Sequence, residues 1–354
     1  MSNIASLFLY LSVYILSAFF LMQAQKQKTN RISLAFILGL SLPILLAAFR
    51  YDVGTDYLNY TWMYESASRL TFSQWLTTEA NFSGIPLGIW IFSKISSSFN
   101  TPIVFFGLTA CFIWMPVSLT IKKYLNQGAF LASLLMLTSI FSYGLNMMKQ
   151  CIAISIIVWG LRYVHEQKIL KYVLVVFFAT FFHPTAFVAI GIYFLWTAPK
   201  TFFSFKKICI IGMAIVAILI FPTILQMLGG RWESYIQYQG EISNKVFYLE
   251  VLLLFAFVLL RKKLISLDFR NNLLIAIFFI GVILEFVGFY SPYIKRIALY
   301  YTFPQYLLIA QLPMLAKRNK IVVEIGVFAY IIGLFILNYY ILGNSEIFPY
   351  QTIV

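Results

Sequence analysis

The sequence predicts an all-α protein that crosses a membrane many times, and three observations support this. Of its 354 residues, 61% are hydrophobic and only 11% are charged, whereas a soluble domain is nearer half apolar and a quarter charged. Apolar stretches of roughly 20 residues recur from one end of the chain to the other, each about the length that spans a bilayer. The basic residues lie between these stretches, a placement typical of membrane orientation and not of a nucleic-acid-binding face.

About ten apolar stretches are long enough to cross the hydrocarbon layer completely, and two shorter ones are predicted to be re-entrant or interfacial. The stretch 84–98 is short for a crossing, and the stretch 172–198 is interrupted by His183 and Pro184. We expect all of these elements to form a single membrane domain over residues 1–354. The full spans are expected at residues 4–22, 32–49, 102–121, 127–147, 148–166, 208–228, 246–260, 272–289, 297–316 and 321–342.

The distribution of lysine and arginine predicts which side each loop occupies, because cytoplasmic loops are enriched in both. If the two short stretches do not cross, most of the 26 basic residues lie on the cytoplasmic side. If both cross, much of this bias is lost, so we expect the first arrangement, with both chain termini on the outer face. The segments then expected at the outer face are the loops 50–83 and 229–245, residues 146–150 and 290–296, and the tail around Tyr350.

Several function classes are disfavoured by missing motifs. Cys111, Cys151 and Cys209 form no CxxC pair, and the chain has only 2 histidines, so neither a disulfide framework nor a zinc site is supported. No phosphate-binding loop, HExxH, GxSxG or GxGxxG motif occurs in a usable context. An ATP-driven pump, a zinc protease and an ordinary serine hydrolase are therefore not expected.

The segment that follows the second span combines a cation with two carboxylates. Arg50 stands at the membrane boundary, Asp52 and Asp56 are four residues apart, and Gly54 between them permits a tight turn. One interpretation is a polar loop whose arginine reaches toward the interface. The other is an acid/base carboxylate beside an arginine that binds an anion. Spacing alone leaves both open.

A second polar group begins the span 148–166. Asn146, Lys149 and Gln150 have the spacing that places side chains on one face of a helix. A charge in the outer zone of a membrane is costly and usually faces a cavity or a partner. Lys149 is therefore either a functional cation or an interfacial lysine that extends toward water.

The two histidines receive different interpretations. His183 lies at a helix break between two apolar half-segments, and such a break at membrane depth must be buried in protein or line a cavity. Its ordinary pKa suits a general base, although a lone histidine in apolar surroundings is more often hydrogen-bonded structure. His165, among lysines and arginines, is expected to be a solvated loop residue.

Two adjacent cations, Lys295 and Arg296, stand at the outer end of a span, against the positive-inside rule. A diphosphate would explain them, because arginine forms bidentate, charge-assisted bonds to phosphate. Tyr300 lies one turn further along the same helix face. Arg231 and Trp232 could add a phosphate contact and a ring for sugar stacking, or belong to a plain loop. Two acidic residues near the outer ends of their spans could pair with the cations: Glu250 and Glu285.

Taken together, these segments resemble the EpsG-like, Wzy-type O-antigen (polysaccharide) polymerase family. They occur in the family's order and cover most of the chain. One position departs from the expected pattern, since Lys149 stands where the family is expected to carry arginine, and lysine lacks the bidentate fork. The matching segments are Phe49-Arg50-Tyr51-Asp52-Val53-Gly54-Thr55-Asp56-Tyr57 with Tyr60, Asn146-Met147-Met148-Lys149-Gln150, Phe182-His183-Pro184-Thr185, Arg296-Ile297-Ala298-Leu299-Tyr300-Tyr301 and Phe348-Pro349-Tyr350.

The resemblance implies a GT-C-like membrane glycosyltransferase of the bacterial inner membrane. It implies an enzyme of O-antigen or related lipopolysaccharide biosynthesis that joins undecaprenyl-diphosphate-linked repeat units at the periplasmic face and releases undecaprenyl diphosphate. The expected partners are these lipid-linked units, as donor and acceptor, the bilayer and a chain-length regulator protein, with no nucleic acid. No cofactor or metal is expected, although the carboxylates could hold Mg²⁺.

The predicted site assigns three roles, and which of three groups is the base stays open. The candidate bases are Asp52, Asp56 and His183. The candidate diphosphate ligands are Arg50, Lys149, Arg231 and Arg296. The candidate substrate contacts are Tyr57, Tyr60, Asn146, Gln150, Trp232, Glu285, Tyr300 and Tyr350.

Two alternatives share much of this site. A flippase or transporter of lipid-linked oligosaccharide would bind the same substrate without chemistry, and it would need polar residues along a path through both leaflets. The embedded polar residues are instead expected near the outer face, which favours an enzyme. An O-antigen ligase would use the same donor and leaving group, so the sequence does not separate it from a polymerase.

Overall fold

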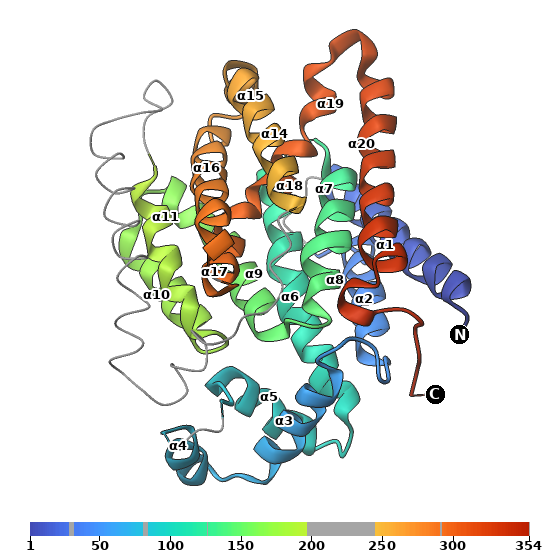
Figure 1. The fold of residues 1–354 in the computed structure, drawn as a ribbon, viewed down its shortest axis with the longest axis vertical. Helices are drawn as coiled ribbons and strands as arrows, with labels where there is room; N and C mark the ends of the chain where they lie inside the picture. Colours follow the sequence, from blue (N-terminus) through green and yellow to red (C-terminus); the bar gives the residue numbers. More distant parts are fainter. Residues whose placement is uncertain (28–31, 81–83, 126, 197–244, 291, 354) are drawn as a thin grey trace. The chain divides into compact units, whose positions relative to one another are not determined.

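The computed structural model describes residues 1–27, 32–80, 84–125, 127–196, 245–290 and 292–353. In this part of the chain the regular structure is helical, apart from one isolated antiparallel bridge between Arg50 and Thr352. The α-helices are α1 (Asn3–Lys26), α2 (Leu34–Ala48), α3 (Tyr57–Arg69), α4 (Phe72–Ala80), α5 (Leu87–Ser97), α6 (Pro102–Tyr124), α7 (Ala129–Met136), α8 (Ser142–Gly144), α9 (Met148–His165), α10 (Ile169–Thr180), α11 (Ile190–Phe194), α14 (Lys245–Leu259), α15 (Arg261–Leu267), α16 (Asn271–Val287), α17 (Pro292–Thr302), α18 (Pro304–Ile309), α19 (Leu312–Leu315) and α20 (Lys320–Phe335) (Figure 1).

The chain folds into two compact units whose segments alternate along the sequence. Unit 1 comprises Met1–Trp159, Phe177–Ala186 and Ile309–Val354, and unit 2 comprises Gly160–Val176 and Phe187–Leu308. The single membrane domain expected over residues 1–354 stays a prediction, and each unit is described by itself below. Each unit contains part of the predicted site.

A proline within α2 helps to hold the first three long helices of unit 1 together. Pro43 has no N–H group, so it cannot donate to the carbonyl of Gly39 one turn earlier. That carbonyl instead accepts hydrogen bonds from Ser17 Oγ of α1 (2.6 Å) and Trp114 Nε1 of α6 (3.0 Å). Gly39 also has no side chain, and a Cβ there would lie 2.7 Å from Leu21 Cγ. The helices therefore approach closely at one point.

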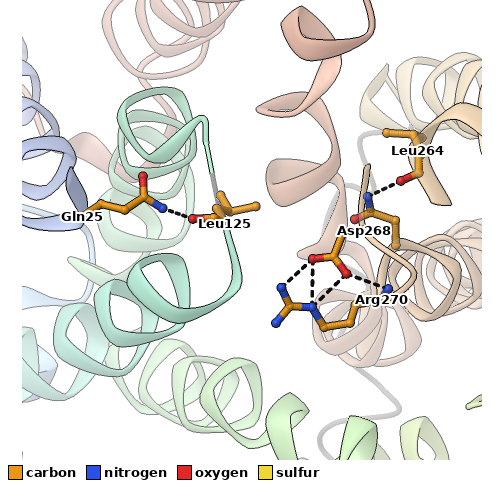
Figure 2. A network of polar contacts seen from close by, with 6 residues as sticks. Gln25, Leu125, Leu264, Asp268 and Arg270 are labelled. Carbon is orange, nitrogen blue, oxygen red and sulfur yellow. Dashed lines mark hydrogen bonds and ion pairs between the residues drawn. The ribbon is translucent and has the colours of Figure 1, made fainter. Parts of the chain in front are cut away.

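Unit 1 has two polar ends, separated by the length of α1, about 36 Å for a helix of this length. At one end Gln25 Nε2 donates to the carbonyl of Leu125, as Figure 2 shows, and Lys122 Nζ lies 5.2 Å from the centre of the Phe36 ring. At the other end the N-terminal amine of Met1 contacts the carbonyl of Tyr350 at 3.4 Å, and Figure 1 shows the two chain termini near each other. The predicted basic end and the end with the candidate site are therefore opposite ends of this unit.

In unit 2, α16 packs closely on α17 and α14. A Cβ on Gly281 would lie 2.8 Å from the backbone carbonyl of Tyr301, so glycine permits this approach. The turn before α16 is closed by an ion pair, in which the Arg270 guanidinium donates to both carboxylate oxygens of Asp268 (Figure 2). Asn271 Nδ2 then donates to the carbonyl of Leu264 at 2.8 Å. This end of α16 is therefore fixed by buried and half-buried polar contacts.

Three helices of the described part are long and apolar enough to span a membrane: α1, α6, and α20 extended by a π-helical turn to Ile341. Shorter apolar helices, which include α2, α10, α14 and α16, add to these, and the chain is a multi-pass membrane protein. Most predicted spans coincide with helices. The predicted span 208–228 lies outside the described residues.

The predicted span 297–316 is wrong as one continuous helix. The structure has three short helices there, α17, α18 and α19, with α18 beginning at Pro304 and Pro313 near the start of α19. Each proline lacks the N–H that would continue the hydrogen-bond ladder. The two short stretches have the expected interruptions: 84–98 contains only the 11 residues of α5, and α10 ends at Thr180 before a 3₁₀ segment.

Candidate functional site

The loop between α2 and α3, residues 49–56, is named the Arg50 loop. Arg50 is buried, with 1% of the residue's surface exposed. Its Nη1 donates to the carbonyl of Leu145 at 2.7 Å, and Nη2 contacts the sulfur of Met148 at 3.4 Å. The guanidinium carbon lies 4.9 Å from the ring centre of Phe106 and 5.8 Å from that of Tyr57. Arg50 therefore joins the Arg50 loop to the break between α8 and α9.

Aromatic rings, and not carboxylates, surround this buried cation. No carboxylate forms an ion pair with Arg50 in the described ranges. Burial lowers the pKa of Arg50 to about 10, an effect partly opposed by nearby phenols. The Tyr57 ring stacks on Phe106 with centres 5.0 Å apart. The phenols that partly oppose the lowering of the Arg50 pKa are those of Tyr10, Tyr57, Tyr60 and Tyr350.

The C-terminal tail, residues 343–353, lies along the Arg50 loop and accepts hydrogen bonds from its backbone. The Tyr51 N–H donates to Gln351 (2.9 Å), and the Gly54 N–H donates to Glu346 (3.0 Å). In return, the Ile353 N–H donates to the carbonyl of Phe49 at 3.0 Å. Side chains fix the tail itself, through hydrogen bonds from Tyr350 OH to the Leu46 carbonyl, from Tyr10 OH to the Ile347 carbonyl and from the Tyr350 N–H to Ser6 Oγ.

Asn146 links the Arg50 loop to this tail. Its Oδ1 accepts from the backbone N–H of Asp56 at 3.2 Å, and its Nδ2 donates to the carbonyl of Ser345 at 2.7 Å. The same Ser345 carbonyl accepts from the N–H of Thr55 at 3.3 Å. Gly54 has φ +100 and lies so close that a Cβ would be 2.5 Å from Asn146 Oδ1. The side chain of Asn146 is buried.

Two carboxylates and one ammonium group in this region are accessible. Asp52 is exposed and has φ 49, a left-handed conformation that costs a non-glycine residue roughly 1–2 kcal/mol. Asp56 is half-buried and accepts a long 3.5 Å contact from Asn59 Nδ2. Lys149 is half-buried and is the second residue of α9. The positive end of a helix dipole and a lysine both favour an anion at this position.

His183 lies in the helix break after α10. Its Nδ1 is 2.6 Å from Thr185 Oγ1, and the ring is half-buried. The preceding Phe182 is buried against Gly88, and the Gly88 N–H donates to the carbonyl of Phe181 at 2.8 Å. Phe182 also contacts Phe112, which is six residues from Phe106 on α6, or about 9 Å along the helix.

Unit 2 holds the remaining charges of the predicted site. Glu250 of α14 and Glu285 of α16 are buried and lie within electrostatic reach of each other and of Lys295. Gln305 Nε2 donates to Glu250 Oε1 at 2.9 Å. Arg296, the next residue of α17, has an exposed side chain. Both carboxylates interact electrostatically with Lys295, one member of the predicted cationic pair.

The EpsG family model matches residues 33–352. This chain belongs to the EpsG family. The match begins just before α2 and ends at Thr352, so it covers the Arg50 loop, Asn146, His183, Arg296 and nearly all of the tail. No curated protein and no solved structure matches the chain.

The site residues predicted from the sequence of this EpsG family protein differ in how exposed they are. Arg50 is buried, and aromatic rings and a carbonyl surround its guanidinium. This position favours a structural role, and the predicted contact of Arg50 with diphosphate stays a prediction. Burial likewise places most of the predicted substrate contacts in the interior, namely Tyr57, Tyr60, Asn146, Gln150, Glu285, Tyr300 and Tyr350. Arg231 and Trp232 lie outside the described residues.

Two further corrections concern residues that sequence reasoning placed differently or omitted. His165 was expected to be solvated, but its ring packs edge-on against Trp196 with ring centres 4.9 Å apart. Sequence reasoning also omitted three residues of this region. Phe106 contacts Arg50, Tyr10 contacts the tail, and Ser345 contacts Asn146. No pattern marks Tyr10 or Phe106 within its apolar helix, because 23 Tyr and 36 Phe occur in the chain.

Proposed function

We propose that this EpsG family protein is a polysaccharide polymerase that joins lipid-diphosphate-linked oligosaccharide repeat units. The observation that carries the proposal is the accessible group Asp52, Asp56 and Lys149, held at one end of unit 1 by buried contacts. Carboxylates suit proton removal from a sugar hydroxyl, and a cation at a helix N-terminus suits a phosphate. The proposed location is the periplasmic face of a bacterial inner membrane, in a GT-C-like arrangement of about ten spans.

The proposed reaction transfers the growing chain from its carrier to the non-reducing sugar of a new repeat unit. The bond between the anomeric carbon and the diphosphate oxygen breaks, and undecaprenyl diphosphate leaves with the electron pair. A new glycosidic bond forms from the acceptor hydroxyl, whose proton passes to Asp52, Asp56 or His183. The diphosphate is already a good leaving group, so the proposal includes no metal.

The proposed diphosphate ligands are the accessible cations. In unit 1, Lys149 contributes a charge at the start of α9. Arg296, exposed on α17, stays in the proposal as a candidate ligand chosen from the sequence. Such groups stabilise the negative charge that develops on the leaving diphosphate. Arg231 stays in the proposal as a further ligand. Arg50 acts indirectly, because its bond to the Leu145 carbonyl holds the Arg50 loop beside the start of α9.

The test uses purified protein with an undecaprenyl-diphosphate-linked repeat unit as both donor and acceptor, without nucleotide sugar or ATP. Products are separated by size, and the proposal expects a ladder spaced by one repeat unit. The variants Asp52→Asn, Asp56→Asn and His183→Gln identify the base, since only loss of the base removes the pH dependence of turnover. A chain-length regulator, if added, should change the ladder's length distribution.

Other outcomes would replace the proposal. Movement of the lipid-linked unit across liposome bilayers without a ladder would identify a flippase. Transfer of a finished polymer to a different lipid acceptor, without elongation, would identify a ligase. Neither activity is expected from the wild-type protein.

A further inference from the structure

We infer that Asn146 is a positioning residue that, together with the C-terminal tail, holds the Arg50 loop in its reactive conformation. This inference rests on the proposed function, because it concerns the loop that carries Asp52 and Asp56. It differs from the role expected from sequence, in which Asn146 contacts the sugar. The evidence lies in where the loop obtains its hydrogen bonds, how Asn146 uses its amide, and where the backbone is strained.

The Arg50 loop depends on acceptors outside itself. The backbone N–H groups of Tyr51, Gly54 and Thr55 donate to carbonyls of the tail, and that of Asp56 donates to Asn146. A loop whose donors are satisfied by other segments takes its shape from them. The two acceptor segments are more than 190 residues apart in sequence, since 199 positions separate Asn146 from Ser345. The loop conformation is therefore a tertiary property.

Both ends of the Asn146 amide are used within the protein. Oδ1 faces an N–H donor at Asp56, and Nδ2 faces a carbonyl at Ser345, so the partners themselves fix the orientation of the amide. The side chain is buried, at 4% exposure. A sugar hydroxyl would have to displace one of these partners to reach it. This geometry fits a brace between two segments and not a ligand for substrate.

Strained backbone conformations occur where the Arg50 loop and the C-terminal tail hydrogen-bond to each other. Asp52, Ser345 and Glu346 all have positive φ, at 49, 70 and 46, although none is glycine. Such conformations persist where the surroundings determine them, and they cluster at functional sites. The carbonyls of Ser345 and Glu346 are the ones that receive the N–H groups of Thr55 and Gly54. The hydrogen bonds across the junction therefore maintain strained backbone on both sides.

The consequence for the reaction is the placement of the two carboxylates. Asn146 anchors the backbone at Asp56, one residue before α3 begins, while the carboxylate of Asp56 stays accessible. A general base must lie within hydrogen-bond reach of the proton it takes. Release of this anchor would let the base move away from the acceptor hydroxyl without altering the diphosphate ligands.

The first experiment measures polymerisation kinetics of Asn146→Ala in the full-length protein. We expect the turnover number to fall about 100-fold, the size of effect that misplacement by about 1 Å can have, while KM for the lipid-linked repeat unit stays unchanged. Asn146→Asp keeps the oxygen that accepts from Asp56 but loses the donor to Ser345, so its loss should be intermediate. Asn319→Ala, an exposed asparagine near the start of α20, is the control.

The second experiment separates a brace from a ligand. In Asn146→Ala, the additional changes Thr55→Cys and Ser345→Cys allow a disulfide to join the loop to the tail where their backbones already hydrogen-bond. Oxidation should restore turnover at least 10-fold if Asn146 positions the loop. Asn146→Ala with only its native cysteines, oxidised in the same way, is the control. A raised KM without rescue by the tether would overturn the inference in favour of direct substrate binding.

A readout without substrate keeps this inference separate from the proposed function. Hydrogen exchange at the amides of Gly54, Thr55 and Asp56 should be faster in Asn146→Ala than in wild type, because their acceptor is lost or moved. Unchanged exchange would refute the positioning role, even if the wild-type protein made no ladder. Failure of the wild type to polymerise, with faster exchange in the variant, would reject the proposed function alone.

Discussion

Arg50 and Arg296 look alike in sequence, since each stands at the end of an apolar stretch with tyrosines close by. In the structure they differ in exposure. Arg50 is 1% exposed, bonded to the Leu145 carbonyl and covered by the rings of Phe106 and Tyr57. The Arg296 side chain is exposed on α17. A guanidinium inside protein contributes by joining segments, whereas an exposed one can meet a ligand.

The neighbours of each arginine explain the difference. Around Arg50, aromatic faces stabilise the cation, because the negative face of a ring attracts a guanidinium. In unit 2 the buried carboxylates of Glu250 and Glu285 lie near Lys295. The adjacent Arg296 has an exposed side chain. Adjacent cations in a sequence can therefore differ in burial, set by which side of the helix meets the protein interior.

The largest expected effect is that of Arg296→Ala on activity. Loss of a preorganised charge at the leaving diphosphate should lower the turnover number by about 100- to 1,000-fold. Protein yield in the membrane and thermal stability should match wild type, because the side chain is exposed. The ladder assay measures the loss, and Arg318→Ala, at an exposed arginine near α20, is the control. Normal polymer from Arg296→Ala would remove the proposed phosphate role.

The next effect is that of Gly54→Ala, which tests the Arg50 loop. A left-handed alanine costs about 1–2 kcal/mol, and its Cβ would also lie 2.5 Å from Asn146 Oδ1. We expect lower stability together with loss of polymer. Gly84→Ala is the matched control, since Gly84 has φ +61 but a Cβ there would meet nothing within 4 Å. Equal behaviour of the two variants in thermal unfolding would show that the contact with Asn146 has no consequence.

A third change addresses the buried arginine directly. Arg50→Met should lower the free energy of unfolding by about 1–3 kcal/mol, because the buried carbonyl of Leu145 loses its donor. Arg296→Met should leave unfolding unchanged. Thermal unfolding in detergent measures both. If the two substitutions destabilised the protein equally, the structural role assigned to Arg50 would have to be abandoned.

The smallest effect is an alkaline one and comes from the phenols near Arg50. Burial raises the pKa of Tyr350 to about 12 and also raises the pKa values of Tyr57 and Tyr60. A raised folded-state pKa stabilises the protein below pH 10, the unfolded value, and this contribution is lost as pH rises through the folded pKa. Arg50 has the opposite effect on stability. Burial lowers its pKa to about 10, so its contribution to the free energy of unfolding rises above that pH.

The three raised tyrosine pKa values should outweigh the single lowered arginine pKa, so we expect the free energy of unfolding to fall above pH 10. Tyr350→Phe should be less stable at pH 8 by about 0.5–1.5 kcal/mol, because it loses the bond to the Leu46 carbonyl. Its stability should then fall less steeply from pH 10 to 12. Unfolding in detergent, with tyrosinate absorbance recorded in parallel, checks this, and the exposed Tyr51→Phe is the control. A profile identical to wild type would contradict the titration of Tyr350.

The helices were largely predictable, and the exception is informative. Long apolar runs predicted α1, α6 and α20, because burial of backbone polar groups in a membrane requires helices. The predicted span 297–316 contains Pro304 and Pro313, yet hydropathy alone made it one helix. Proline within α2 and α6 does not end those helices, so its effect depends on neighbours such as Ser17 and Trp114, which no local pattern reveals.

The candidate site residues were chosen from the sequence by residue type, which carries no information about their exposure. The polar segments at Arg50, Asn146 and Tyr350 were expected at one end of the protein, and in unit 1 they do meet. Which of them would be buried was not predictable, because their neighbours come from distant helices. Phe106 covers Arg50 from α6, and Ser345 holds Asn146 from the tail.

By itself, the sequence determined the membrane character, the helices and the family, since these depend on composition, apolar length and ordered motifs that remain local along the chain. Only the tertiary structure decided which polar groups are buried with partners inside the protein and which are exposed. Exposure and hydrogen-bond partners arise where segments about 100 to 300 positions apart meet, as in the contacts of Arg50 with Leu145 and of Tyr350 with Leu46. A buried polar group must find its partner within the fold, and that partner defines its role.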